Sequence, residues 1–162
     1  SSLSLSINKE NLGNAWFIEN LVKVESSNKE VLMLDNLNYS NDCLSTELEN
    51  KTYKQDPNNQ IDLISRKANE LVYEYNSSSE NFIVFSEAYY SNGWQAYIDD
   101  KKVDHSKVNY LLRGMEVPKG EHTIKFVFKP SVINTGSFIM ASSNFILLIL
   151  IILYFKREVS YV

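Results

Sequence analysis

The sequence predicts a mainly β protein: an antiparallel β-sandwich with a small α/β N-terminal appendage and one C-terminal transmembrane helix. Apolar and polar residues alternate with a period of two between Gln60 and Pro130. The residues before Gln60 mix strand-like and helix-like patterns. The 26 residues from Pro130 to Phe155 contain no charged side chain. We therefore place the appendage at residues 1–59, the sandwich at 60–130, the membrane helix at 131–155 and a tail at 156–162.

The appendage is predicted from three stretches with different composition. Ala15 to Glu25 (AWFIENLVKVE) has the composition of a strand. Asn28 to Asn38 (NKEVLMLDNLN) clusters apolar residues after Ser27, a candidate N-cap, and this predicts a short helix. Leu48 to Gln60 is polar and rich in turn-forming residues, so we expect it to separate the appendage from the sandwich.

The sandwich is predicted from apolar residues that recur at every second position. Clear examples are Leu71-Tyr73-Tyr75, Ile83-Phe85 and Ile124-Phe126-Phe128. Such alternation is typical of antiparallel strands with one buried face. Turn-forming residues divide the strands at Asn76–Ser79, Ser91–Gly93, Asp99–Lys101 and Pro118–Gly120. Five or six strands at this spacing indicate a β-sandwich.

The C-terminal stretch is long and apolar enough to cross a membrane, which takes about 20 residues. The alternative is a buried helix of a soluble protein, but such a helix keeps a polar stripe. The eleven unbroken apolar residues from Phe145 to Phe155 leave no room for a stripe. Lys156 and Arg157 follow them, and basic residues mark the cytoplasmic end of a span. We expect the bulk of the chain outside the cytoplasm and the C-terminus inside.

The first half of the predicted span carries small and polar residues on one helical face: Asn134, Ser137, Ala141 and Asn144. Such a face suits packing against another helix, since asparagine exposed to lipid costs free energy. No other candidate span occurs in the sequence. We therefore expect the C-terminal piece of a longer multi-pass protein, with its other transmembrane helices as partners. A single-pass anchor that dimerises through this face is the alternative.

Composition excludes several classes of function. Residues 1–129 carry 14 Lys and Arg against 19 Asp and Glu, and no basic cluster, so we expect no nucleic-acid partner. The single cysteine, Cys43, excludes an internal disulfide and leaves zinc without a thiolate pair. No phosphate loop, nucleophile elbow or zinc-protease motif occurs. We expect no metal, no cofactor and no catalytic residue in this chain.

An aromatic cluster is the best candidate for a binding site. Its members, with the polar residues that accompany them on the next predicted strand, are Tyr89, Tyr90, Trp94, Tyr97, Asn109, Tyr110 and Arg113. Flat aromatic faces suit sugar rings, and the amide and guanidinium groups suit hydroxyls or a phosphate. Half-buried strands also use alternating aromatics, so the same residues fit the sandwich core and its rim. The residues alone favour the core interpretation.

The order of several short motifs resembles the C-terminal region of the YfhO family of bacterial integral membrane proteins. The matching strings are Gly13-Asn14-Ala15-Trp16-Phe17, Val84-Phe85-Ser86-Glu87-Ala88-Tyr89-Tyr90, Gly93-Trp94-Gln95-Ala96-Tyr97-Ile98-Asp99, Val108-Asn109-Tyr110-Leu111-Leu112-Arg113-Gly114, Val117-Pro118-Lys119-Gly120-Glu121-His122 and Phe128-Lys129-Pro130. The resemblance implies many transmembrane helices, an extracytoplasmic C-terminal domain and a last span. It also implies a membrane part that resembles glycosyltransferases of the C type, whose catalytic acid lies near N-terminal helices that this sequence does not include.

With the apolar span and the β pattern, the resemblance implies the outer domain and last span of a YfhO-like glycosyltransferase that modifies cell-envelope glycopolymers with a lipid-linked sugar donor. This part would bind or position glycan, with membrane lipid, the other helices and a cell-envelope glycan or lipid-linked sugar as partners. The alternative is a structural or assembly ectodomain without a ligand. Exposed aromatics that line a groove would favour binding.

Overall fold

The structure is a computed structural model that describes the backbone of residues 11–159, and the side chains of that range except those of residues 131, 133, 134 and 153–159. The chain divides into two compact units, a β domain that ends at Phe128 and a segment that begins at Lys129. The segment contains helix α2 (Ser131–Val159). In the described part of the β domain the elements are α1 (Ser27–Leu34), β1 (Ala15–Ile18), β2 (Asn20–Lys23), β3 (Asp42–Ser45), β4 (Lys51–Thr52), β5 (Gln60–Lys67), β6 (Glu70–Ser77), β7 (Asn81–Ala88), β8 (Trp94–Ile98), β9 (Lys101–Val103), β10 (Ser106–Val108), β11 (Leu112–Val117) and β12 (Gly120–Phe128).

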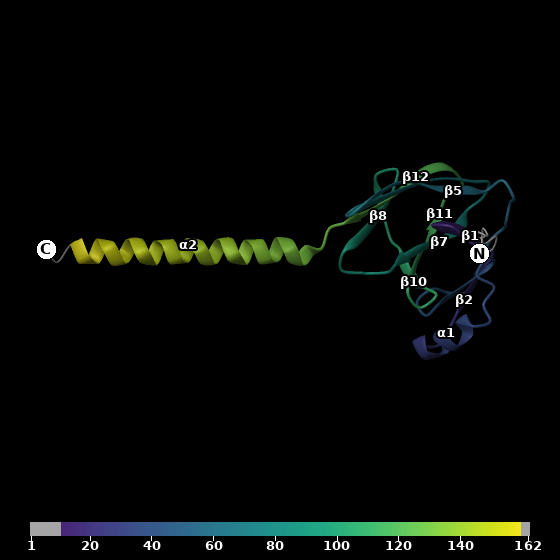
Figure 1. Cartoon of the computed structure of the whole chain (residues 1–162), viewed down its shortest axis with the longest axis horizontal. Helices are drawn as coiled ribbons and strands as arrows, with labels where there is room; N and C mark the ends of the chain where they lie inside the picture. The colour runs from purple at the N-terminus through teal and green to yellow at the C-terminus, as the bar shows by residue number, and fades with distance from the viewer. Residues whose placement is uncertain (1–10, 160–162) are drawn as a thin grey trace, which may run out of the picture. The chain divides into compact units, whose positions relative to one another are not determined.

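The strands form three sheets (Figure 1). A five-stranded sheet has the order β5-β6-β12-β8-β9, and a four-stranded sheet has the order β1-β7-β11-β10. All pairs in these two sheets are antiparallel. The small third sheet, β3-β2-β4, contains the parallel pair β2–β3. The predicted fold class, mainly antiparallel β with one C-terminal apolar helix and a small N-terminal part, is confirmed.

The two larger sheets pack face to face around an aromatic core. Tyr73 and Phe126 contribute from the five-stranded sheet, and Ile83, Phe85 and Met115 from the four-stranded sheet. The rings of Phe85 and Phe126 meet edge to face with centroids 4.9 Å apart. The period-two pattern of β6, β7 and β12 therefore predicted the inner faces correctly.

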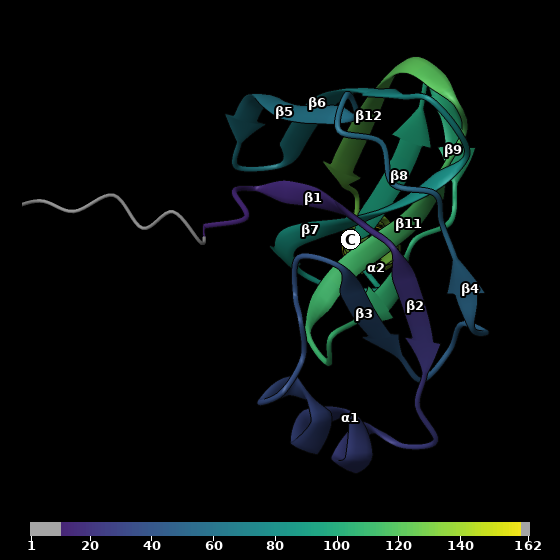
Figure 2. The same ribbon diagram turned by 90° about the vertical axis from the view of Figure 1, so that its right-hand side faces the viewer.

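Strand β7 differs from its prediction because both of its faces are buried. Ile83 and Phe85 face the sandwich core, whereas Phe82 and Val84 belong to a second core with Ile18 of β1. Figure 2 shows β2 and β3 beside β7 and β11, on the side away from the five-stranded sheet. The N-terminal strands thus cover the outer face of the four-stranded sheet, which explains the unbroken apolar run of β7. The domain boundaries at residues 59 and 130 stay predictions.

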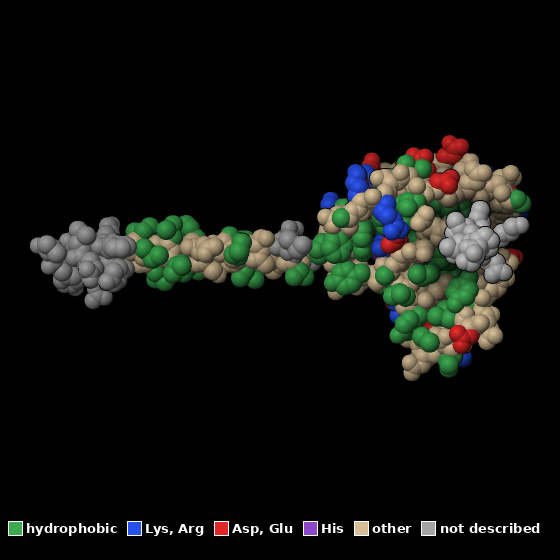
Figure 3. Space-filling model, in the orientation of Figure 1, with side chains coloured by type: hydrophobic (Ala, Val, Ile, Leu, Met, Phe, Trp, Pro, Cys, Tyr) green, Lys and Arg blue, Asp and Glu red, His purple; other side chains and the backbone are tan. Residues whose placement is uncertain are grey.

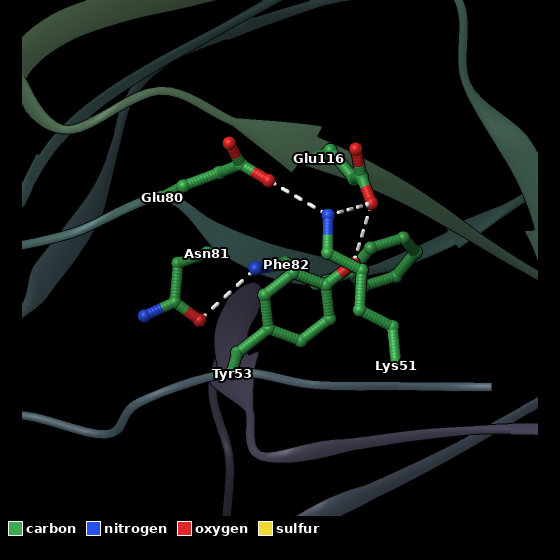
Figure 4. Close-up of polar contacts among 6 residues, drawn as sticks. All are labelled: Lys51, Tyr53, Glu80, Asn81, Phe82 and Glu116. Atoms are coloured by element: carbon green, nitrogen blue, oxygen red, sulfur yellow. Dashed lines mark hydrogen bonds and ion pairs between the residues drawn. The ribbon is translucent and has the colours of Figure 1, made fainter.

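A polar network joins the third sheet to the sandwich (Figure 4). The Tyr53 hydroxyl donates a hydrogen bond of 2.6 Å to Glu116 Oε1, and Lys51 Nζ lies 2.9 Å from the same oxygen. Lys51 Nζ also lies 2.7 Å from Glu80 Oε1, in the turn between β6 and β7. We call Lys51, Tyr53, Glu80 and Glu116 the Tyr53 network. It fixes the segment after β4 against β11.

Helix α1 begins one residue earlier than predicted and ends four residues sooner. Ser26, not Ser27, is the N-cap, and its hydroxyl accepts a hydrogen bond from the Lys29 amide. Glu30 is buried, and its Oε1 accepts a 2.8 Å hydrogen bond from the Tyr110 amide. The helix is thereby tied to the turn between β10 and β11.

Helix α2 is long and apolar enough to cross a membrane over Thr135–Ile152, 18 residues with a mean hydropathy of 2.0. Figure 3 shows hydrophobic side chains along its described surface. The hydroxyls of Ser142 and Ser143 donate to carbonyls four residues earlier, which satisfies them within the helix. On the predicted packing face, Ser137, Ala141 and Asn144 are exposed. The side chain of Asn134 lies outside the described residues, and helix packing stays a prediction.

Candidate binding site around Trp94

Trp94 begins β8 and pairs with Phe128, the last residue of β12. Its ring centroid lies 5.3 Å from that of Phe128. The Arg113 guanidinium carbon lies 4.4 Å from the Trp94 ring centroid, a cation–π distance. The indole is half-buried, so part of its surface packs on the core and part faces outward.

Trp94 lines two hollows of the domain surface. The first has a volume of about 360 Å³ and is otherwise lined by Arg66, Lys67, Ala68, Leu71 and Glu87. The second has a volume of about 250 Å³ and is otherwise lined by Tyr89, Ser91, Gln95, Ala96, Lys102, Val103, Asp104 and His105. Arg66 and Glu87 form an ion pair at the first hollow. Each hollow therefore combines an aromatic surface with charged or polar groups.

Arg113 of β11 is the largest fully buried side chain of the domain, with 2% of its surface exposed. Its guanidinium lies between the Trp94 ring and the Phe126 ring, at 4.4 and 5.0 Å from the two centroids. Nε donates a 2.9 Å hydrogen bond to the Ala88 carbonyl. Burial lowers the pKa of Arg113, while the charge of Glu87 opposes that change. The cationic guanidinium of Arg113 thus packs against the side of the Trp94 ring that faces the core.

Three polar atoms around the Phe126 ring are buried without a hydrogen-bond partner among the described residues. They are Nη1 of Arg113, Nε2 of His105 and the hydroxyl of Tyr73. The rings of His105 and Tyr73 lie 5.6 and 6.3 Å from that of Phe126. Buried polar groups in proteins are almost always bonded to protein or water. The interior beneath Trp94 therefore has hydrogen-bonding capacity that the fold itself does not use.

Burial also shifts the pKa values of these groups. The pKa of His105 is lowered, first by burial and then by the charge of Arg113, which favours a neutral imidazole. Burial and the charge of Glu87 raise the pKa of Tyr73 to about 12. At neutral pH, the groups near Trp94 are thus a cationic arginine, a neutral histidine and a neutral phenol.

The structure brings together part of the predicted aromatic cluster. Tyr89 and Trp94 line the second hollow, and the exposed Tyr90 ring stacks on Phe128 at 6.4 Å. Tyr97 is half-buried, and its hydroxyl bonds to Gln95. Tyr97 is not among the residues that line either hollow.

The two polar members of the predicted cluster are buried. The side-chain oxygen of Asn109 accepts a 2.8 Å hydrogen bond from the Leu44 amide, which joins β3 to the β10–β11 turn. Asn109 and Tyr110 lie in this turn with φ of 46° and 67°, so Tyr110 is not on a strand as predicted. The Tyr110 side chain is exposed. Burial of Asn109 and Arg113 gives both residues a structural role.

Gly93 lies in the turn between β7 and β8, as predicted, and its amide donates a hydrogen bond to the Tyr90 carbonyl. It is not among the described glycines with positive φ, so the backbone conformation of the turn does not by itself require glycine. A Cβ at this position would lie 2.2 Å from the Phe128 ring and 2.8 Å from the Tyr90 ring. Glycine is therefore required for the close approach of these two rings.

Several residues of the hollows were missed by sequence reasoning, notably Arg66, Lys102 and His105. Arg66 lies on β5, Lys102 on β9 and His105 in the loop between β9 and β10. They are up to 39 positions apart, and no spacing connects them. Their positions around Trp94 follow from the strand order β5-β6-β12-β8-β9.

A third hollow of about 390 Å³ lies elsewhere on the domain and is acidic. It is lined by Gln60, Asp62, Glu74, Tyr75, Asn76, Asp99, Glu121, His122 and Thr123. His122 Nδ1 and Asp99 Oδ2 are 2.5 Å apart, and this hydrogen bond raises the pKa of His122. Within residues 11–159, no group of three or more His, Cys, Asp or Glu side chains is arranged to hold a metal ion. This hollow lacks the exposed aromatic face found at Trp94.

Comparison with known proteins identifies the family. The sequence matches the family model of the bacterial membrane protein YfhO over residues 22–140, which is more than half of the chain. No curated protein and no solved structure shows a significant match. The matched region runs from β2 through the Trp94 site into α2, whose apolar span agrees with a membrane protein. The chain belongs to the YfhO family of bacterial membrane proteins.

Proposed function

We propose that the β domain binds or positions a cell-envelope glycan at Trp94, as the extracytoplasmic part of a YfhO-family glycosyltransferase with a lipid-linked sugar donor. Family membership and the apolar helix establish a membrane protein. Lys156 and Arg157 after the span support the extracytoplasmic placement of the β domain. No residue of this chain is assigned a catalytic role, so the transfer chemistry belongs to other helices of the parent protein.

The observation that carries the proposal is that one indole lines two hollows, each of which also contains charged or polar side chains. A sugar ring has apolar C–H faces and a polar edge, so it stacks on an aromatic face while its hydroxyls bond to the rim. Trp94 supplies the face, and Ser91, Gln95 and Lys102 supply hydrogen-bonding groups at the second hollow. Arg113 keeps the ring in place from the core side, so the surface is formed before any ligand arrives.

The test is a titration of the chain in lipid nanodiscs with soluble oligosaccharides of glucose and of N-acetylglucosamine, followed by saturation-transfer NMR. We expect Trp94→Ala to weaken binding about tenfold, since a lost stacking contact of this size corresponds to roughly 1.4 kcal/mol. Trp94→Phe keeps an aromatic ring over Arg113 and should lose less. Trp16→Phe on β1 is the matched control and should leave the affinity unchanged.

Binding that is equal in the wild-type chain and in Trp94→Ala contradicts the proposal. If Trp94→Ala unfolds the domain, Trp94→Leu fills the site without an aromatic face, and binding of folded Trp94→Leu that equals the wild type contradicts the proposal in the same way. Near-UV circular dichroism of each variant reports whether the domain has kept its packing.

The second candidate is a structural or assembly ectodomain without a ligand. It is favoured by one observation: Arg113, Trp94 and Phe126 form a stack that belongs to the sandwich core. Under this function, Trp94 variants change the free energy of unfolding of the domain but no glycan binds at any concentration. Measuring stability and titration on the same variants separates the two functions.

A further inference from the structure

The loops at one end of the β domain converge on the last residue of β12. The Phe128 amide donates a 2.9 Å hydrogen bond to the Asn69 carbonyl, in the β5–β6 turn. Phe128 also pairs with Trp94 and contacts the ring of Tyr90 in the β7–β8 loop. We call this the Phe128 end, and the opposite end, where β12 begins, the Gly120 end.

The β10–β11 turn belongs to the Phe128 end as well. The Leu111 carbonyl accepts a 2.7 Å hydrogen bond from the Tyr89 amide, at the start of the β7–β8 loop. Strand β11 pairs with β7 at Leu112 and Ala88, directly beside this contact. Three loops from both large sheets therefore form one surface.

This surface exposes large apolar side chains. Tyr90, Tyr110 and Leu111 are 51%, 48% and 57% exposed. Each lies in a loop between two strands. Tyrosine combines an apolar ring with a polar hydroxyl, and this combination is enriched at the headgroup level of membranes.

The described charged side chains at this end carry a small positive excess. Glu70 and Glu87 pair with Lys67 and Arg66, and Lys102 and Asp104 both line the second hollow. Lys107 adds a positive charge, with Nζ 5.7 Å from the Tyr110 ring centroid, and Lys129 follows Phe128 directly in the chain. On the face drawn in Figure 3, Lys and Arg side chains gather beside β8, and most Asp and Glu side chains lie toward β5. A small positive excess on an acidic domain is complementary to anionic lipid headgroups.

Chain length limits how far this surface can lie from a bilayer. Phe128 is followed by Lys129 and Pro130, and α2 begins at Ser131. Three extended residues reach at most about 10 Å. From Ser131 to Thr135 the helix rises only about 6 Å, and the headgroup layer is itself about 6 Å thick. The distance from the end of β12 to the headgroups of any membrane that contains Thr135–Ile152 is therefore no more than the length of one or two side chains.

We propose that Tyr90, Tyr110 and Leu111 rest in the lipid headgroup layer of the bilayer that α2 spans. Lipid headgroups are the partner of this surface, because the short chain to α2 and the positive charge both favour contact with the membrane. It does not depend on glycan binding. Both hollows beside Trp94 would then open close to the membrane, where a lipid-linked ligand is presented.

The test places one tryptophan at each end of β12. The full chain with Trp16→Phe and Trp94→Phe receives either Tyr90→Trp or Lys119→Trp, the latter at the Gly120 end. Each variant is reconstituted in nanodiscs of phosphatidylcholine and phosphatidylglycerol. Lipids with a nitroxide on the headgroup then quench tryptophan fluorescence at short range. We expect the Tyr90→Trp emission to be quenched several-fold more than the Lys119→Trp emission.

Two further measurements define the failure of the proposal. Adding Leu111→Ser and Tyr110→Ser to Tyr90→Trp should reduce quenching while the far-UV spectrum stays the same. Equal quenching of both reporters overturns the proposal, and so does a Tyr90→Trp residue that aqueous iodide quenches freely in nanodiscs. If Tyr90→Trp is shielded from both iodide and nitroxide lipid, protein covers this surface and the lipid assignment is wrong. Glycan titration is a separate readout, so the two proposals fail independently.

Discussion

The Phe128 end and the Gly120 end of the β domain are built from the same strands but differ in how they hold charge. At the Gly120 end, acids lie on an open hollow, and Lys51 pairs with Glu80 and Glu116 at the surface. At the Phe128 end, the key cation, Arg113, is buried between aromatic rings. The charged groups of the Gly120 end therefore lie in water, whereas the charge of Arg113 at the Phe128 end lies among apolar rings in the protein interior.

This contrast predicts where substitutions should destabilise the domain most. Exposed ion pairs are worth little because water and salt screen them. A buried guanidinium that packs on two rings contributes through dispersion, cation–π attraction and filled volume together. We therefore expect the domain to be robust at the Gly120 end and sensitive at the Phe128 end.

Arg113 provides the largest expected effect. Arg113→Ala leaves a cavity between Trp94 and Phe126 and should lower the free energy of unfolding by about 3 kcal/mol. Arg113→Met fills most of that volume without a charge and should cost clearly less, since a well-packed apolar replacement of a buried charge is often tolerated. Denaturant unfolding followed by tryptophan fluorescence measures both. A loss below about 1 kcal/mol for Arg113→Ala would remove the contrast between the two ends.

Tyr53 tests a buried contact of the Gly120 end (Figure 4). Its hydroxyl donates to Glu116 over 2.6 Å, and this bond is the main cause of the lowered pKa of Glu116. Tyr53→Phe should cost about 1.5 kcal/mol, as expected for a hydrogen bond to a charged group. Lys51→Met is the matched control in the same network, and it should cost no more than about 0.5 kcal/mol because Lys51 is exposed. Equal losses would show that the ion pairs, not the buried hydroxyl, hold β11 to the third sheet.

The two histidines should give the smallest effect, with opposite pH dependence. The Asp99 hydrogen bond, with the Lys119 carbonyl, raises the pKa of His122 above 6.5. Its stabilisation is therefore complete below pH 6.5 and is lost as the pH rises through the folded value. Burial lowers the pKa of His105 below 6.5. Its stabilisation is complete above pH 6.5 and is lost as the pH falls toward the folded value.

Thermal midpoints measured from about pH 5 to about pH 8 test this opposition. His122→Gln should remove the loss of stability on the alkaline side, and His105→Gln should remove the loss on the acidic side. If both histidine variants had the same pH profile of stability, the opposite pH dependence expected from the ion pair of His122 and the burial of His105 would be contradicted.

Much of the fold could be predicted because its determinants are local. The alternation of Leu71, Tyr73 and Tyr75 predicted β6, and the Asp99-Asp100 turn predicted the β8–β9 hairpin, where both residues have positive φ. The run Phe82 to Phe85 was interpreted as a half-buried strand. Its second face is buried by β1, more than 60 positions earlier in the chain. Local alternation cannot predict burial by so distant a strand.

The candidate site could be predicted only in part. The aromatic residues near Asn92 were recognised by composition, and Tyr89 and Trp94 do line a hollow. Asn109 and Arg113 were candidates for contact with a ligand or for the sandwich core, and both are buried. A strand pattern fixes which residues share a face, but the pairing of β11 between β7 and β10 decides that this face points into the core.

Short-range periodicity and composition are enough to predict an alternating β domain and an apolar span in this protein. The family match adds that the chain is a YfhO membrane protein. The burial of Arg113 behind Trp94 and the convergence of three loops at the Phe128 end follow only from the tertiary structure. Those contacts join residues that are distant in the chain, and the free energy of burying them depends on the completed sheets rather than on any local segment.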